Sequence, residues 1–372
     1  MTYVPKVDVA VTWFKDYSGD LNPRITVLFP WTDTPIKLDN PATLPAGIVN
    51  ALAWSPNGEF LAVAHQTTPF VTIYQRSGTT FTKIANPAIP PANIGQGAAW
   101  SPNGEFLAVA HDITPFITIY QRAGSTFTKL ANPATLPTGA GKDAAWSPNG
   151  EFLTVLHAVT PFVTIYQRSG TTFTKLANPA TLPTGASWNA SWSPNGEFLA
   201  VAHQTTPFVT IYQRTGATFT KIANPATLPT GNGYGIDWSP NGEFLTIVHA
   251  VTPFITIYQR SSRVTFTKLA DPATLPTGGG EEAAWSPNGE FLAVAHQVTP
   301  FVTIYQRSGT TFTKLANPTL PVSSVWDADW SPNGEFLAVA VDATPFVTIY
   351  QTDKTLPVNG VVRIEKVIRE ED

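Results

Sequence analysis

Histidine, a residue able to ligate metals and to move protons, recurs at one position of a repeated unit in this chain. Six copies stand 46 or 47 residues apart: His65, His111, His157, His203, His249 and His296. The seventh equivalent position holds Val341. Metal ligands must converge to within about 2 Å of one ion, whereas equivalent positions of a repeated unit are spread along an array. Because one copy is a valine and no convergence is expected, a structural role is favoured over metal binding or base catalysis.

Acidic residues form the second candidate group, and most of them fall where the repeats differ. They are Asp143, Asp237, Glu281, Glu282, Asp327 and Asp329. Paired carboxylates can bind a cation or act as general acid and base. However, the sequence contains no DxDxDG-type loop, no Gly-rich phosphate loop, no GxSxG elbow and no HExxH motif. We therefore predict no catalytic residue, no metal site and no cofactor.

A repeated unit positions these residues. The word WSPNGEFL occurs seven times, and its tryptophan falls at Trp54, Trp100, Trp146, Trp192, Trp238, Trp285 and Trp330. A unit of this length cannot bury its apolar faces alone and stacks on its neighbours. Within residues 96–138, the turn signals SPNG, DITP and AGST separate four short segments of β type, with no helical period. Four short strands per unit of about 46 residues predict the blade of an all-β propeller.

The repeat resembles the WD repeat. The pattern W-S-P-N-G-x-F-L-A-V-A, followed by x-I-Y-Q, is similar to that family, in which an S-P-D-G turn precedes the second strand. The resemblance covers nearly the whole chain and implies a propeller. Tyr74-Gln75 and its copies stand where the family has Trp-Asp, and the Gly-His pair is missing, so the family's Asp–His–Ser/Thr–Trp network is not expected. The near-identical repeats and their NPATLPTG crossover are also similar to predicted virion structural proteins of tailed phages.

Two arrangements could close the ring. Residues 23–45 align without a gap on residues 69–91, and the segment DVAVTW at residues 8–13 can stand for the preceding FLAVAH strand, which together suggests the second, third and outer strands of a further blade. Val361–Ile368 would supply its inner strand, so that residues 1–46 and 352–372 together form the closing blade of one domain over residues 1–372. We prefer this eight-bladed ring. In the seven-bladed alternative, Ile36–Asp39 supplies the outer strand that the last full unit lacks, but three strand-like segments have no place. In both, strands from the two termini share one blade and remove an open edge.

The repeats disagree mainly at one zone, four and three residues before each repeat tryptophan. In a propeller this zone and the turn between the second and third strands open on one face, around the central channel. We predict a partner-binding rim here: Asn50, Gln96, Lys142, Asp143, Trp188, Asn189, Tyr234, Glu281, Glu282, Trp326 and Asp327. Loops carry function most often but also drift most freely, so relaxed drift after duplication is the alternative interpretation.

Composition limits the classes of function. Charged residues make up 13% of the 372 residues and the formal net charge is −4, so a basic surface for nucleic acid is not expected. Cysteine is absent, which excludes disulfides and thiol chemistry. The first residues lack the pattern of a signal peptide, and no apolar run reaches the length of a membrane span. We therefore expect neither a nucleic-acid nor a membrane partner.

These observations favour a non-enzymatic structural or interaction propeller. Its rim would bind a protein partner within a larger assembly such as a phage virion, or otherwise in the cytoplasm. The first alternative is a carbohydrate-binding, lectin-like propeller with a glycan ligand. It is less favoured because a multivalent lectin would repeat its contact residues in every blade, and the rim is heterogeneous. The second alternative is a hydrolase or lyase at the channel mouth, which would depend on the carboxylates.

Overall fold

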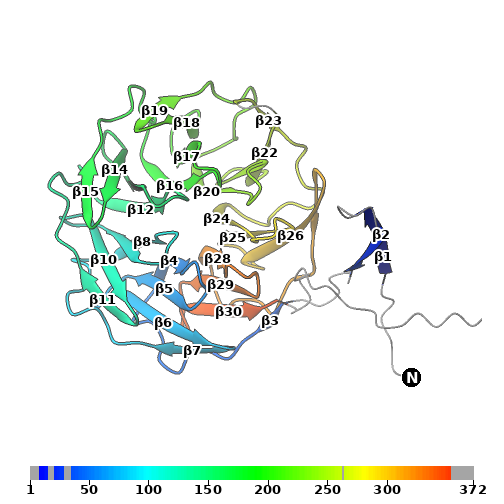
Figure 1. Ribbon diagram of the computed structural model, residues 1–372, viewed down its shortest axis with the longest axis horizontal. Helices are drawn as coiled ribbons and strands as arrows, with labels where there is room; N and C mark the ends of the chain where they lie inside the picture. Colours follow the sequence, from blue (N-terminus) through cyan, green and yellow to red (C-terminus); the bar gives the residue numbers. More distant parts are fainter. Residues whose placement is uncertain (1–7, 16–20, 29–34, 262–263, 353–372) are drawn as a thin grey trace, which may run out of the picture.

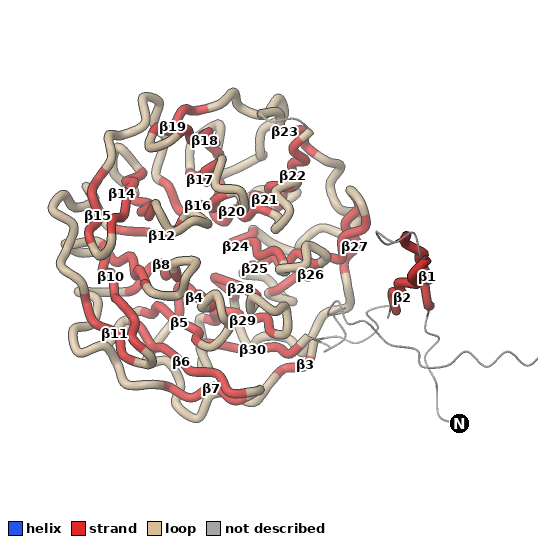
Figure 2. The backbone as a smooth tube through the Cα atoms, viewed as in Figure 1, coloured by secondary structure: helices blue, strands red, loops and turns tan. Residues whose placement is uncertain are grey.

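The computed structural model describes residues 8–15, 21–28, 35–261 and 264–352. Seven four-stranded antiparallel sheets stand around one axis as the blades of a propeller (Figure 1). Strands and connecting loops make up the described part of the chain (Figure 2). Within that part, no helix is long and apolar enough to cross a membrane.

Each blade runs from an inner strand at the axis to an outer strand at the circumference. Blade 1 contains β4 (Val49–Trp54), β5 (Phe60–His65), β6 (Val71–Ser77) and β7 (Thr80–Lys83). Blade 2 contains β8 (Gly95–Trp100), β9 (Phe106–His111), β10 (Ile117–Ala123) and β11 (Thr126–Lys129). Blade 3 contains β12 (Gly141–Trp146), β13 (Phe152–His157), β14 (Val163–Ser169) and β15 (Thr172–Lys175).

The remaining blades keep the same order of strands. Blade 4 contains β16 (Ser187–Trp192), β17 (Phe198–His203), β18 (Val209–Thr215) and β19 (Thr218–Lys221). Blade 5 contains β20 (Gly233–Trp238), β21 (Phe244–His249), β22 (Ile255–Arg260) and β23 (Phe266–Lys268). Blade 6 contains β24 (Gly280–Trp285), β25 (Phe291–His296), β26 (Val302–Ser308) and β27 (Thr311–Lys314). Blade 7 contains β28 (Val325–Trp330), β29 (Phe336–Val341), β30 (Val347–Gln351) and, from the other end of the chain, β3 (Ile36–Lys37).

The expected eight-bladed ring is wrong, because the ring has seven blades. Ile36 pairs with Gln351 and Lys37 with Tyr350, so β3 covers the edge of β30 that would otherwise expose unpaired backbone groups. β1 (Asp8–Lys15) and β2 (Leu21–Leu28) pair with each other in a separate two-stranded sheet. Of residues 23–45, the described ones contribute to β2 of this separate sheet and to β3 of blade 7, and they add no eighth blade. Val361–Ile368, the expected inner strand of an eighth blade, lies outside the described residues.

Aromatic residues of the repeat hold neighbouring blades together. All six residues of β5 are buried, because the second strand is covered by a blade on each side. Trp100 stacks on Phe60 of the preceding blade, with ring centroids 6.1 Å apart, and meets Phe127 of its own outer strand edge to face at 5.6 Å. The Tyr120 hydroxyl donates to the Ile89 carbonyl of the crossover, at 2.9 Å. The tryptophan stack and the tyrosine hydrogen bond recur in all seven blades. The contact with a phenylalanine of the outer strand recurs in blades 1 to 6, because β3 of blade 7 has no phenylalanine.

Candidate functional site

All eleven predicted rim residues line one cavity of about 770 Å³ at the centre of the ring. The inner strands β4, β8, β12, β16, β20, β24 and β28 surround it, as their positions in Figure 1 show. Each of these strands begins with the variable residues and ends at the repeat tryptophan. The repeat therefore places a constant side chain at one end of every inner strand and a variable one at the other.

Hydrogen bonds join the variable rim to the variable turn between the second and third strands. Asn50 accepts a hydrogen bond from Gln66 at 3.0 Å in blade 1. In blade 2, the Gln96 amide donates to Asp112 at 2.8 Å. In blade 6, the Gln297 amide donates to Glu281 at 2.7 Å. In these three blades, the two variable segments are thus joined at the mouth of the cavity.

Aromatic residues and the cavity's lysine gather on one side of the mouth. The Lys142 ammonium lies 5.5 Å from the centroid of the Trp188 ring and 3.4 Å from an Asp112 carboxylate oxygen of blade 2. Trp188 in turn meets Tyr234 edge to face, with ring centroids 6.2 Å apart. Trp326 belongs to blade 7 and is 37% exposed. Blades 2 to 5 therefore share an interblade cluster that the other blades do not repeat.

Deeper in the channel, carboxylates of one blade accept hydrogen bonds from the inner strand of the next. An inner strand is the edge of its sheet, so alternate N–H groups face the channel without a ladder partner. Asp327 accepts from the Leu52 N–H at 2.6 Å, and Asp329 accepts from the Trp54 N–H at 2.9 Å. In blade 5, Asp237 accepts from the Trp285 N–H at 2.9 Å. These carboxylates link the inner strands of blades 7 and 1 and of blades 5 and 6 across the channel wall.

Glycines in the inner strands make room for neighbouring carboxylates. A Cβ atom on Gly97 would lie 2.6 Å from Cα of Asp143 in the next blade. A Cβ atom on Gly235 would lie 2.6 Å from Cα of Glu282. Glu282 passes over Gly235 and accepts a hydrogen bond of 2.7 Å from Asn189, two blades away. At these two positions, a residue without a side chain in one blade lies against a carboxylate residue of the next blade.

Burial raises the pKa values of the acidic groups in this cavity, and for some of them neighbouring carboxylates add to the shift. Burial and, to a smaller extent, the nearby Asp327 carboxylate raise the pKa of Asp143 to about 7, against the lowering effect of hydrogen bonds from the Ala144 and Ala190 N–H groups. Burial raises the pKa of Asp237 and of Glu281 to about 7 as well. For Glu282, burial and the charges of Asp327, Asp143 and Asp237 push the pKa well above its usual range.

Lys142 is the one cationic residue among the described residues that line this cavity. Burial raises the pKa of Asp327 to about 6 and that of Asp329 well above normal. Protons or an external cation can therefore neutralise the cavity near neutral pH. Over the described ranges, no group of three histidine, aspartate or glutamate side chains has the geometry to hold a metal ion.

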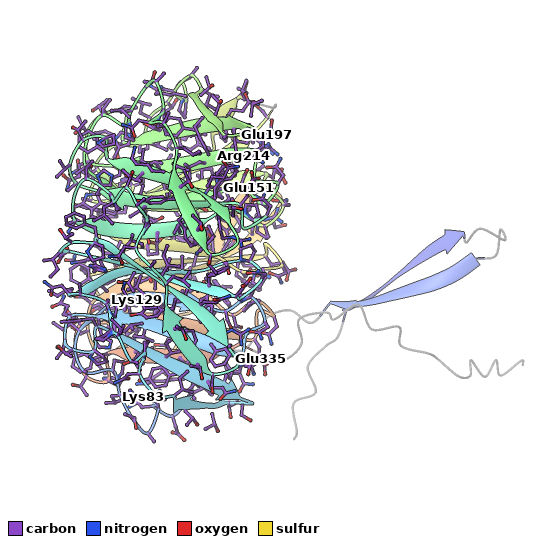
Figure 3. The ribbon with its side chains drawn as sticks, turned by 60° about the vertical axis from the view of Figure 1, so that its left-hand side comes forward. Lys83, Lys129, Glu151, Glu197, Arg214 and Glu335 are labelled. Atoms are coloured by element: carbon purple, nitrogen blue, oxygen red, sulfur yellow. The ribbon has the colours of Figure 1, made fainter. Side chains whose placement is uncertain are left out.

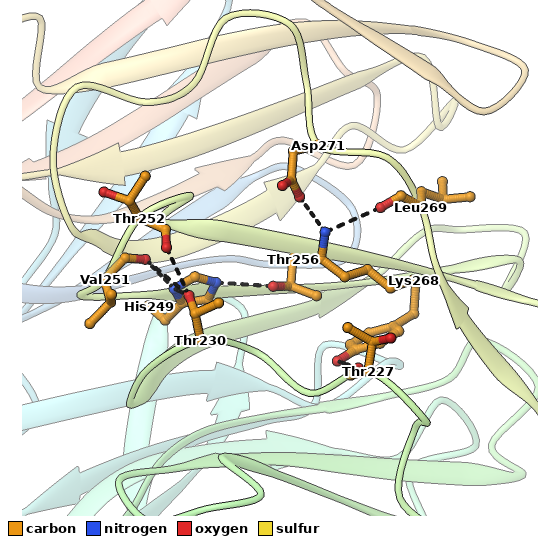
Figure 4. A network of polar contacts seen from close by, with 10 residues as sticks. Thr227, Thr230, His249, Val251, Thr252, Thr256, Lys268, Leu269 and Asp271 are labelled. Atoms are coloured by element: carbon orange, nitrogen blue, oxygen red, sulfur yellow. Dashed lines mark hydrogen bonds and ion pairs between the residues drawn. The ribbon is translucent and has the colours of Figure 1, made fainter.

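The repeated histidines lie inside the blades and not in the cavity. His249 contacts the Thr256 hydroxyl through Nε2 at 3.0 Å and the Val251 carbonyl through Nδ1 at 2.7 Å (Figure 4). The other five make the same contact with a threonine of the third strand. Burial lowers the pKa of His249 to about 4, which favours a neutral ring at neutral pH. The position of these side chains agrees with a packing role.

Blade 7 lacks this histidine. Val341 occupies the position, and both it and Thr348 are almost completely buried. Within the described residues, the Thr348 hydroxyl has no hydrogen-bond partner. The sequence marks Val341 as different but does not reveal the unpaired hydroxyl opposite it.

Sequence reasoning placed Asp237 and Asp329 beside the rim but did not assign them to it, although both line the cavity. It also missed Asp112 as the acidic partner of Lys142. Asp112 could have been noticed in the sequence because it lies in the variable turn of blade 2. Its pairing with Lys142 of blade 3 is evident only once the blades are arranged in the ring.

Comparisons with known proteins agree with this fold. Residues 41–67 match the family model "WD domain, G-beta repeat", whereas no curated protein matches the sequence. The chain is similar to Kuenenia stuttgartiensis hydrazine synthase, with 16% identity, a TM-score of 0.65 and coverage of 86% of this chain and 98% of that chain. The β-propeller domain of Myceliophteria thermophila Cps50 (Swd1) has 14% identity, a TM-score of 0.63 and coverage of 84% and 99%.

A chain of the mitotic checkpoint complex has 16% identity, a TM-score of 0.64 and coverage of 88% of this chain and 98% of that chain. At such low identities, these structures establish the fold alone. The chain is a seven-bladed β-propeller that resembles WD-repeat propellers.

Proposed function

We propose that this propeller is a non-enzymatic interaction module that binds one protein partner through the variable rim. The observation that carries the proposal is the convergence of all eleven variable residues on one cavity, while the SPNG turn is identical in seven blades. WD-repeat propellers are typical protein-interaction scaffolds, which supports this class of function. The hydrazine synthase neighbour shows that the fold does not decide the question.

The chemistry of the mouth favours a partner segment with a cationic side chain flanked by apolar ones. Carboxylates dominate the cavity, and a bound lysine or arginine would replace the protons that their raised pKa values hold. Apolar residues of the variable turns surround the mouth and are exposed by 47% to 53%: Ile113, Val159, Val251 and Val298. Exposed apolar residues around a polar centre are characteristic of an interaction surface.

Asymmetry favours one partner over several identical ligands. Lys142, Trp188 and Tyr234 form a cluster on one side of the mouth, and Glu281 with Gln297 lies elsewhere on it. A lectin with a sugar site in each blade would need these contacts to recur. The glycan-binding alternative is therefore less favoured, and so is a hydrolase or lyase, because the channel carboxylates accept hydrogen bonds from the neighbouring inner strands.

The test combines Lys142→Ala, Trp188→Ala and Trp326→Ala in one variant. The control variant carries Lys83→Ala, Lys129→Ala and Lys175→Ala on outer strands, away from the cavity. Each variant serves as bait to isolate a partner protein from the native source. A partner recovered in this way is then purified and titrated against both variants. We expect the control to retain binding and the rim variant to lose at least about tenfold in affinity, as for a few interface hot spots. Equal affinity of the two variants would contradict the proposal.

A larger assembly is the setting that we propose, on the resemblance of the repeats to predicted virion proteins of tailed phages. Mass spectrometry of purified particles, with the copy number of this chain measured against a major structural protein, tests this setting. Recovery of the chain only in the soluble fraction of the source cells would place it in the cytoplasm instead.

A further inference from the structure

The turn between the first and second strands carries an Asn–Gly pair in all seven blades. These turns do not line the cavity. Figure 3 shows Glu151, Glu197 and Glu335, the residues that follow the Asn–Gly pair in three blades, toward the same side of the ring. Their chemistry is therefore separate from that of the proposed binding rim.

Asn–Gly is the dipeptide most prone to deamidation, because glycine has no side chain to hinder attack by its own backbone nitrogen. The glycine nitrogen loses its proton and bonds to the asparagine Cγ. The bond from Cγ to Nδ2 then breaks and ammonia leaves. Water opens the resulting cyclic imide and yields aspartate or isoaspartate. No oxidant or cofactor takes part, so the reaction needs only a free glycine nitrogen and a mobile asparagine side chain.

The folded turn withholds both requirements, as blade 3 illustrates. The Gly150 N–H donates to the Ser147 carbonyl at 2.8 Å. Asn149 Oδ1 accepts from the Ser147 hydroxyl at 2.7 Å and from the Glu151 N–H at 3.1 Å. Asn149 Nδ2 donates to a Glu151 carboxylate oxygen at 3.1 Å. The attacking nitrogen is therefore engaged, and three hydrogen bonds fix the group that it would attack.

Glu151 holds the Nδ2 nitrogen of Asn149, which is the group that deamidation would release as ammonia. Its second carboxylate oxygen accepts from the Gln167 amide at 2.9 Å, which holds the carboxylate in place beside Asn149. A glutamate occupies this position in every blade, and its contact with asparagine Nδ2 recurs around the ring.

We propose that the seven Asn–Gly pairs are deamidation sites that the folded turn protects and that unfolding exposes. The glutamate after each pair slows the reaction by holding the asparagine amide in place. Deamidation replaces an N–H donor by a carboxylate about 3 Å from the glutamate carboxylate, the separation that the Nδ2–Oε2 contact has now. Two like charges at that distance repel. A chain that has reacted while unfolded therefore rebuilds a less stable turn, and each further deamidated turn lowers the stability of the refolded ring.

The test is Glu151→Ala, with the six unchanged turns of the same molecule as internal controls. The folded variant is incubated at mildly alkaline pH and digested, and the deamidated fraction at each asparagine is measured by mass spectrometry. We expect Asn149 to react about threefold to tenfold faster than in the wild type, the factor that one hydrogen bond is worth. Glu151→Gln keeps an acceptor oxygen and should stay close to the wild-type rate. Equal rates at Asn149 in Glu151→Ala and the wild type would overturn the role of the glutamate.

A second measurement uses the wild-type chain, folded and in denaturant. All seven sites should deamidate faster in the denatured chain, and equal rates in both states would overturn the protection by the turn. Asn149→Asp mimics the product and should lower the melting temperature, whereas Asn149→Asp with Glu151→Gln should recover most of the loss. Failure of the double variant to recover would refute the charge repulsion.

Discussion

Thr348→Val should stabilise the protein, although it removes a hydroxyl. In the six other blades, the equivalent threonine hydroxyl makes a hydrogen bond to a histidine. The Thr348 hydroxyl is buried and has no hydrogen-bond partner within the described residues, because Val341 replaces the histidine of the other blades. Valine has nearly the same shape as threonine and carries no hydroxyl. The same substitution in blade 3, Thr164→Val, should destabilise, because Thr164 contacts His157 Nε2 at 3.0 Å.

The magnitude follows from the cost of an unpaired buried hydroxyl, about 1–3 kcal/mol. Thr348→Val should therefore raise the free energy of unfolding by about 1–2 kcal/mol, and Thr164→Val should lower it by a similar amount. With an unfolding entropy of about 2 cal/mol/K per residue, each 1 kcal/mol moves the melting temperature of a ring of this size by about 1–2 °C. Chemical denaturation at neutral pH gives the larger signal.

Val341→His completes the assay as a double-mutant cycle. Alone, it should stabilise by giving Thr348 the partner that its equivalents have. Combined with Thr348→Val, it should destabilise, because the imidazole would then be buried opposite a methyl group. The reasoning is refuted if Thr348→Val destabilises the ring, or if the effects of the two substitutions add.

Two further predictions concern the channel. Gly235→Ala should lower the free energy of unfolding by about 1–3 kcal/mol, because its Cβ atom would lie 2.6 Å from Cα of Glu282 and 2.8 Å from the Glu281 carbonyl oxygen. Glu282→Ala removes neither of these backbone atoms, so Gly235→Ala with Glu282→Ala should recover only part of the loss; urea denaturation checks both, and a neutral Gly235→Ala would contradict the close contact. Asp143→Asn should raise the melting temperature more at pH 8 than at pH 5. Its folded-state pKa of about 7 lies above the unfolded value of 3.8, so the aspartate's contribution is present below about pH 4 and is lost as the pH rises through 7. An equal effect at both pH values would show that the carboxylate is not perturbed.

Local patterns predicted the blades well because each strand is encoded by its own turn signals. The WSPNG word fixed the end of every inner strand, and counting back from Trp54 and its copies located the residues that line the cavity. The blade count was wrong because similarity of residues 23–45 to part of a blade does not show which strands they pair with. In the structure, β2 pairs with β1 and β3 pairs with β30. The seven-bladed alternative placed the missing outer strand at Ile36–Asp39, where β3 lies. With only two residues, β3 has too short a pattern to outweigh the alignment.

Contacts between blades were beyond the reach of the sequence for a different reason. Lys142 meets Asp112, and Gly97 makes room for Asp143, only because the ring sets adjacent inner strands side by side. These pairs are separated by 30 and 46 residues in the chain. No pattern within one repeat encodes them.

The pairing of β3 with β30 decides how the ring responds to mechanical force. The strands are antiparallel, and Ile36 lies opposite Gln351, so the chain leaves both strands at the same end of the pairing. A pull between the two ends loads the hydrogen bonds one after another, in the manner of a zipper, and not all at once. Leu38 donates one further bond to the Ile349 carbonyl, at 2.9 Å. Blade 7 is thus the place where a pull between the two ends would first separate paired strands.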